Sequence, residues 1–174
     1  MDGQKIFPEE VIIEKINKNH NFSSFVSYEK DLKDFLIEDA LTNQELKLST
    51  TFLWLYQQKL VSYITLLTDK INLEGDLQTF FRDKGIAYFS LPALKIGRLC
   101  VDDHFQRKGL GRMMLVFAAK KAQEICDDKA GCRFLTVDAK KDSILFYKKQ
   151  GFEILKMRTD GTAVMYVDLL KFLP

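Results

Sequence analysis

Residues 99–112 read LCVDDHFQRKGLGR, an extended apolar run followed by a basic loop that contains two glycines and opens into a helical pattern. Gly109 and Gly111 remove side chains where we expect the backbone to turn tightly. The first amides of the following helix have no acceptor within that helix and point outward at its positive end. The stretch therefore predicts an anion site, and a phosphate-bearing ligand is its natural occupant.

The spacing of the loop excludes the two commonest nucleotide-binding motifs. A Walker phosphate loop needs GxxxxGK[ST], a string that this sequence does not contain. A dinucleotide fingerprint needs GxGxxG, but Met114 stands at the third glycine position after Gly109 and Gly111. A tight strand-to-helix turn that binds no ligand is the structural alternative for this loop.

Composition predicts one globular domain over residues 1–174. The 174 residues are 47% hydrophobic and 29% charged, and the net charge of +2 argues against an electrostatic grip on long nucleic acid. The first residues lack a signal-peptide pattern, and no apolar run is long enough to span a membrane. The three cysteines have no CxxC spacing, so we expect neither a disulfide framework nor a metal site. These features favour a reducing cytoplasm.

The first half of the chain predicts a helix followed by a hairpin. Apolar residues recur at helical spacing over residues 29–46. Residues 51–56 and 60–67 are rich in aromatic and β-branched side chains, and the polar residues between them suit a short turn. We then expect a short helix over 76–81 before Gly85, and extended segments over 86–89 and 95–101 around Pro92.

The second half predicts a buried helix and three more strands. The helix covers residues 110–125 and can end at Gly131, before a strand over 134–137. Asp142 or Ser143 can cap a helix that runs through Tyr147 and stops at Gly151. Asp160-Gly161 predicts a closing hairpin between 152–155 and 163–167, so the chain should end in strands. The fold class is α/β, a mixed sheet with helices packed on its faces.

Two segments together resemble one enzyme family. Gln106, Gly109 and Gly111 follow a strand that ends Leu99-x-Val101, which resembles the acetyl-CoA loop of the GNAT family of N-acetyltransferases. Residues 146–152, FYKKQGF, are similar to that family's FYxxxGF segment and follow in the same order. The resemblance implies a central, mostly antiparallel, twisted sheet with helices on both faces, and acetyl-CoA as cosubstrate with no metal.

The resemblance also implies roles for particular residues. Backbone groups of Leu99, Cys100 and Val101 would pair with the pantetheine arm of the cofactor like an added strand. Amides of the loop would cradle the pyrophosphate of the cofactor, and the side chains of Arg107, Lys108 and Arg112 would add charge-assisted contacts. The loop consists of Gln106, Arg107, Lys108, Gly109, Leu110, Gly111 and Arg112.

Tyr147 would be the catalytic residue. An amine would attack the acetyl carbonyl directly in a ternary complex, and the Tyr147 hydroxyl, protonated at neutral pH, would donate a proton to the CoA thiolate. Glu74, Asp102 and His104 are candidates for the general base by residue type alone, and a chain of waters would serve as well. A packing aromatic is the alternative reading of Tyr147.

A narrower resemblance concerns residues 25–36 and 94–102, which look like the branch that contains toxin acetyltransferases of toxin-antitoxin modules. Known toxins of that branch acetylate aminoacyl-tRNA. Three classes of acceptor therefore stay open: an amine-bearing small molecule, a peptide or a charged tRNA. If the protein is a toxin, it would also bind an antitoxin. Apolar surface on the terminal strands would suit a homodimer. A non-catalytic CoA-binding module is the rival from another class, and the membrane is not an expected partner.

Overall fold

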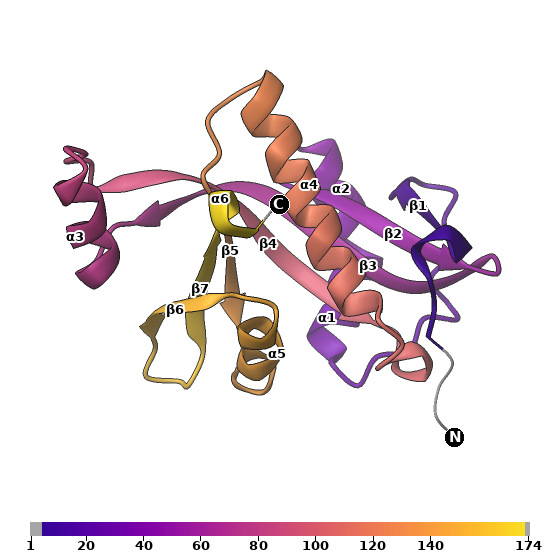
Figure 1. The fold of residues 1–174 in the computed structure, drawn as a ribbon. Helices are drawn as coiled ribbons and strands as arrows, with labels where there is room; N and C mark the ends of the chain where they lie inside the picture. Colours follow the sequence, from indigo (N-terminus) through magenta and orange to yellow (C-terminus); the bar gives the residue numbers. More distant parts are fainter. Residues whose placement is uncertain (1–4, 173–174) are drawn as a thin grey trace. The chain divides into compact units, whose positions relative to one another are not determined.

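The computed structural model describes residues 5–172 and contains a seven-stranded sheet in the order β1-β2-β3-β4-β5-β7-β6. Two compact units divide the chain: Met1–Leu67 with Ile96–Phe117, and Thr68–Lys95 with Ala118–Pro174. Strands β3 (Lys59–Asn72) and β4 (Ser90–Val101) contribute residues to both units, and Figure 1 shows the elements along the chain. The expected α/β class with a mostly antiparallel sheet is confirmed.

The hairpin of the first unit forms as predicted. Strand β2 (Thr50–Tyr56) pairs antiparallel with β3, and β1 (Val11–Lys15) pairs antiparallel with β2. Gln57 and Gln58 make the turn at φ of 48° and 62°, which is the conformation that a two-residue hairpin needs even though neither residue is glycine.

The helix expected over 29–46 is present, with an interruption that the periodicity did not show. It consists of α1 (Lys30–Asp34), a π-helical turn over Phe35–Asp39 and α2 (Ala40–Glu45). Within the π turn, the Ala40 N–H donates to the Phe35 carbonyl.

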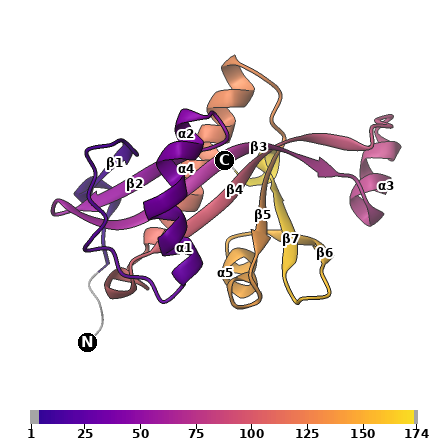
Figure 2. The ribbon, with the colours of Figure 1, turned by 180° about the vertical axis from the view of Figure 1, so that it is seen from behind.

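Side chains of β2 alternate between the two faces of the strand, and each face packs against a different helical segment. Leu53 belongs to a core cluster with Tyr63 of β3 and with Phe35 and Leu36 of the helical segment. On the opposite face, Phe52 and Trp54 make edge-to-face contacts with Phe117 of α4 (Leu110–Asp128). Figures 1 and 2 show these helical layers from opposite sides. The two-residue period of β2 thus fixes which helix covers which face.

The second unit contains the remaining strands and helices. Strand β7 (Ala163–Asp168) pairs antiparallel with both β5 (Phe134–Ala139) and β6 (Glu153–Met157). Phe81 of α3 (Gly75–Asp83) packs in a core cluster with Phe134 and Tyr166. Helix α5 covers Ile144–Lys149 and helix α6 covers Leu169–Phe172. Three 3₁₀ turns cover Pro8–Glu10, Asp103–Phe105 and Lys141–Ser143.

Four local predictions were wrong. Residues 86–89 form no strand, and β4 begins at Ser90 and runs through Pro92, whose carbonyl accepts a hydrogen bond from the Arg133 amide. Helix α4 ends at Asp128 without a left-handed Gly131. No side-chain cap forms at Ser143. The described chain ends in the short helix α6, because Leu169 stays buried after the last strand.

The hairpin and stop signals of the second half are confirmed, since Gly151 and Gly161 have φ of 89° and 84°.

Across residues 5–172, none of the helices combines the length and the apolar character that crossing a membrane requires.

Candidate active site

The end of β4 presents backbone rather than reactive side chains. Leu99 and Val101 are half-buried on either side of Cys100, which is 4% exposed. Burial raises the pKa of the Cys100 thiol to about 11, although a hydrogen bond to the Ser27 hydroxyl opposes that shift. The thiol therefore stays protonated at neutral pH, and a protonated thiol is a poor nucleophile.

Asp102 fixes the turn that follows the strand. Its buried carboxylate accepts hydrogen bonds from the Val26 amide at 2.7 Å and from the His104 amide at 2.9 Å. Its own amide donates to the Val61 carbonyl of β3 at 2.9 Å. The exposed His104 ring also lies 3.1 Å from the same carboxylate. Asp102 was a base candidate by residue type, and its contacts are those of a residue that positions a loop.

The glycine loop, residues 106–112, has two residues in the left-handed region. Arg107 has φ of 61° and Gly109 has φ of 94°, and the Lys108 carbonyl between them accepts a hydrogen bond from the Ile6 amide at 3.1 Å. Gly111 does not take positive φ and lies in the first turn of α4. The expectation that both glycines make the turn is therefore corrected: Arg107 and Gly109 make it.

The loop leads directly into the 19-residue helix α4. The Gly109 carbonyl accepts the Met113 amide, so the helical hydrogen bonds begin there and the amides of the first turn have no acceptor within the helix. Leu110 is buried, whereas the side chains of Arg107 and Arg112 are exposed. The Lys108 ammonium lies 5.3 Å from the Phe105 ring centre, and the Gln106 side chain donates to Asp103. The loop thus combines free amides with cationic side chains.

The tyrosine segment, residues 146–152, belongs to the second unit. Tyr147 is 5% exposed and packs edge-to-face against Phe146 and Phe152, with ring centres 5.1 and 5.3 Å away. Gly151, in the left-handed conformation, lets the chain reverse so that the Phe152 amide donates to the Tyr147 carbonyl at 3.1 Å. Burial raises the pKa of Tyr147 above its ordinary value. The hydroxyl therefore keeps its proton at neutral pH.

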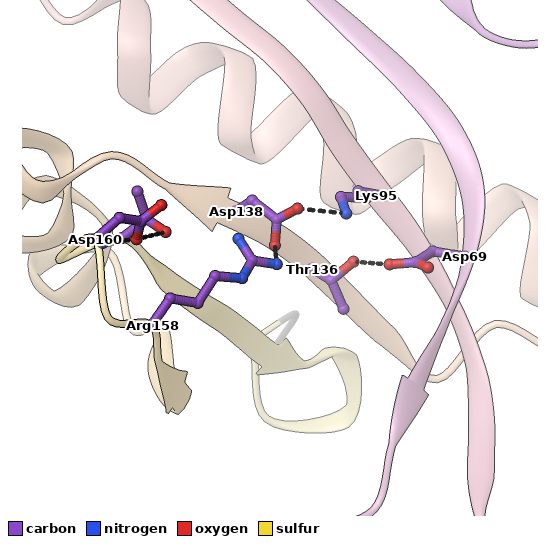
Figure 3. Close-up of polar contacts among 7 residues, drawn as sticks. Asp69, Lys95, Thr136, Asp138, Arg158 and Asp160 are labelled. Carbon is purple, nitrogen blue, oxygen red and sulfur yellow. Dashed lines mark hydrogen bonds and ion pairs between the residues drawn. The ribbon is translucent and has the colours of Figure 1, made fainter.

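A charged cavity on the second unit was not foreseen from the sequence. Lys95 of β4 and Arg158 bind the two oxygens of Asp138 at 2.7 and 2.9 Å, and Thr136 donates to Asp69 at 2.7 Å (Figure 3). These residues lie far apart in the sequence and match no motif, so only the sheet brings them together. Over residues 5–172, no three His, Cys, Asp or Glu side chains cluster in a way that could hold a metal ion.

A comparison with known families decides the assignment. The model described as "Acetyltransferase (GNAT) domain" matches residues 49–154, which include the glycine loop and the whole tyrosine segment. The chain belongs to the GNAT acetyltransferase family. It is accordingly an acyltransferase, as the paired segments predicted.

Solved structures share this GNAT fold. A tyrosine-to-phenylalanine mutant of KacT aligns with a TM-score of 0.81 at 19% identity, covering 94% of this chain and 97% of that chain. AtaT complexed with acetyl-methionyl-tRNAfMet aligns with a TM-score of 0.75 at 19% identity, covering 88% and 93%. A mutant AtaT toxin bound to the C-terminus of the antitoxin AtaR gives 0.74 at 18% identity, covering 94% and 96%. These toxin structures share the fold of this chain.

Proposed function

We propose that this chain is an acetyl-CoA-dependent N-acetyltransferase that moves an acetyl group to a primary amine by direct attack in a ternary complex. The glycine loop is the observation that carries the proposal. Its left-handed Arg107 and Gly109 precede the free amides of α4, and this arrangement suits a pyrophosphate. The match of the family model to residues 49–154 supports the same assignment.

In this proposal the cofactor lies along the end of β4 and the glycine loop. Backbone groups of Leu99, Cys100 and Val101 pair with the pantetheine arm. Amides from Gln106 to Arg112, including those of Leu110 and Gly111, hold the pyrophosphate, and cations within the loop add charge-assisted contacts. Structures of AtaT with acetyl-CoA support this choice of cosubstrate.

Tyr147 is the proposed general acid. The departing CoA thiolate needs a proton, and a buried tyrosine whose pKa is raised still carries one at neutral pH. The two units then act as one acetyltransferase domain over residues 1–174, which is supported by the way β3 and β4 contribute to both. The free cysteines favour the cytoplasm as its location.

An acceptor screen with labelled acetyl-CoA tests this function. The panel contains small amines, peptides and charged tRNA, and the proposal predicts transfer to at least one class. Binding of acetyl-CoA with no transfer to any amine would instead indicate a non-catalytic CoA-binding module. Tyr147→Phe in the same assay separates enzymatic transfer from background acetylation.

A toxin that acetylates aminoacyl-tRNA is the second candidate. It is favoured by the fold match to AtaT, whose structures include complexes with acetyl-methionyl-tRNAfMet and with the antitoxin AtaR. This candidate predicts growth arrest on expression, relieved by an antitoxin encoded beside the gene. Normal growth with an intact, active enzyme would contradict it.

A further inference from the structure

Two of the three cysteines lie together where α4 ends and β5 begins, and we call Cys126 and Cys132 the thiol pair. Cys126 is in the last turn of α4, and its thiol donates a hydrogen bond to the carbonyl oxygen of Cys132. Both residues belong to the second unit, and both are free thiols. Their separation of six residues matches no motif, so the fold brings the two side chains together.

The segment that joins the two cysteines is anchored at both ends. The amides of Lys129 and Ala130 donate to the Ile125 carbonyl at 3.0 and 2.9 Å, which turns the chain back as the helix ends. The Arg133 amide donates to the Pro92 carbonyl of β4 at 2.9 Å. The proximity of the thiol pair is therefore a property of the folded backbone rather than of two mobile side chains.

The two thiols differ in their access to solvent. Cys126 is exposed, whereas Cys132 is 5% exposed and its sulfur lies 3.8 Å from the Phe134 carbonyl oxygen. Burial raises the pKa of Cys132 to about 11, and the charge of the Cys126 side chain and its hydrogen bond with Cys132 raise it further. A solute thus reaches Cys126 directly, and Cys132 is a protected thiol beside it.

We propose that the thiol pair is an oxidation site, at which hydrogen peroxide converts Cys126 and Cys132 into a reversible intramolecular disulfide. In the first step the Cys126 sulfur, as thiolate, attacks one peroxide oxygen. The O–O bond breaks, the other oxygen leaves as hydroxide and takes the thiol proton to become water, and Cys126 becomes a sulfenic acid. The inference is independent of the proposed acetyltransferase function.

In the second step the Cys132 sulfur attacks the sulfur of the sulfenic acid. The S–O bond breaks, hydroxide leaves and takes the Cys132 proton, and a second water forms. Two thiols are thereby oxidised by two electrons, and one peroxide is reduced to two waters. Cytoplasmic thiols reduce such a bond by exchange, so it persists only while peroxide is present. The buried partner thus keeps Cys126 from irreversible oxidation to sulfinic acid.

Peptide mapping tests the disulfide on the full chain. The protein is treated with hydrogen peroxide, its remaining thiols are blocked with N-ethylmaleimide in denaturant, and it is digested with trypsin without reductant. Because trypsin cleaves after Lys129, the two cysteines fall in separate peptides, 122–129 and 130–133. We expect these peptides joined, an unblocked protein lighter by two hydrogen atoms, and one maleimide on Cys100. Dithiothreitol should restore two more reactive thiols.

Three variants assign the roles of the cysteines. Cys126→Ser changes an exposed side chain and should form no disulfide. Cys132→Ser removes the thiol that resolves the first product, so Cys126 should accumulate as a sulfenic acid that dimedone traps, and then as a sulfinic acid. Cys100→Ala is the matched control, since Cys100 is a buried thiol of the first unit, and it should form the disulfide as the wild type does.

The joined peptides, together with their absence in Cys126→Ser, would establish the site. Three results would overturn the proposal: a sulfinic acid on Cys126 of the wild type, a disulfide that joins two chains, or a thiol pair that stays reduced in excess peroxide. Acetyl transfer is not a readout in any of these experiments, so their outcome and that of the acceptor screen are separate.

Discussion

The glycine loop and the tyrosine segment each contain a glycine at large positive φ, Gly109 at 94° and Gly151 at 89°, but they use it differently. In the loop the turn exposes amides at the start of α4, so the function lies in the backbone. In the tyrosine segment the turn folds the chain back on Tyr147 and buries that side chain between two aromatic rings. The loop should therefore tolerate changes of side chain that preserve its backbone angles, whereas the tyrosine segment depends on a single hydroxyl.

The largest expected effect is that of Tyr147→Phe, which removes this hydroxyl and keeps the packing. Loss of a general acid should lower kcat by about 10²–10⁴-fold with little change in the Kd for acetyl-CoA. Because the pKa of Tyr147 lies above its ordinary value, kcat should not lose this acid up to about pH 10. Steady-state kinetics and calorimetry measure the two quantities.

Tyr166→Phe is the control, because Tyr166 is also buried in the second unit and its hydroxyl donates to Glu153. It should leave kcat unchanged. An unchanged kcat in Tyr147→Phe would remove Tyr147 as the acid and with it the comparison between the two regions.

Asp102→Ala tests whether the loop is positioned by the fold rather than by its ligand. The change removes a buried carboxylate and leaves the part-buried amides of Val26 and His104 without their acceptor, so the free energy of unfolding should fall by about 1–3 kcal/mol. Urea denaturation measures it, and Asp127→Ala on the exposed end of α4 should cost under about 0.5 kcal/mol. A variant of normal stability with a shifted pH–rate profile would instead make Asp102 part of the chemistry.

Gly109→Ala tests the backbone half of the comparison. There is room for the added methyl group, whose nearest neighbour would be the Ile6 carbonyl oxygen at 3.9 Å, so the penalty comes from φ rather than from a clash. The loop should move to relieve about 1–2 kcal/mol of strain, and the Kd for acetyl-CoA should rise about tenfold.

Gly85→Ala is matched to this change, since Gly85 has φ of 77° and no atom within 4 Å of the added methyl group. It should lower stability by a similar amount and leave the Kd unchanged. Equal Kd values for Gly109→Ala and the wild type would show that the loop geometry does not matter for binding.

Asp138→Asn should have the smallest effect and a distinctive pH dependence. Burial raises the pKa of Asp138, but the hydrogen bonds and charges of Lys95 and Arg158 outweigh it and hold the pKa below its ordinary value. The stabilisation is thus present above the unfolded pKa of about 4 and is lost as pH falls through the folded pKa.

Because the carboxylate is partly exposed, the variant should cost only about 0.5 kcal/mol at pH 7, and the difference from the wild type should shrink as pH falls through the folded pKa. Urea denaturation at pH 7 and at a series of acidic pH values checks this. A constant difference would show that packing, rather than charge, stabilises this part of the second unit.

Local signals predicted most of the elements that carry the candidate site. Three of these signals depend on neighbours in sequence, and all are present: the aromatic and β-branched run at 51–56, the helical period after Leu110 and the left-handed stop at Gly151. Features that depend on distant partners were missed. Pro92 stays in β4 although it lacks an amide, and its carbonyl pairs with Arg133 forty-one residues later.

The same distinction applies to the functional residues. The glycine loop could be predicted because its residues are consecutive in the sequence. Even there, the prediction placed Gly111 in the turn, whereas Arg107 takes the left-handed conformation instead. The charged cavity on the second unit could not be found, because Lys95 and Asp138 are 43 residues apart and meet only when their strands enter one sheet.

The most direct test of the central claim is a calorimetric titration of the wild-type chain with acetyl-CoA beside its truncated form, S-acetyl-4′-phosphopantetheine, which lacks the adenosine part and the pyrophosphate. If the glycine loop is the pyrophosphate site, acetyl-CoA will bind saturably at one site and the truncated thioester will bind at least tenfold more weakly. An absence of acetyl-CoA binding at millimolar concentration, or equal affinities for both ligands, would contradict the account.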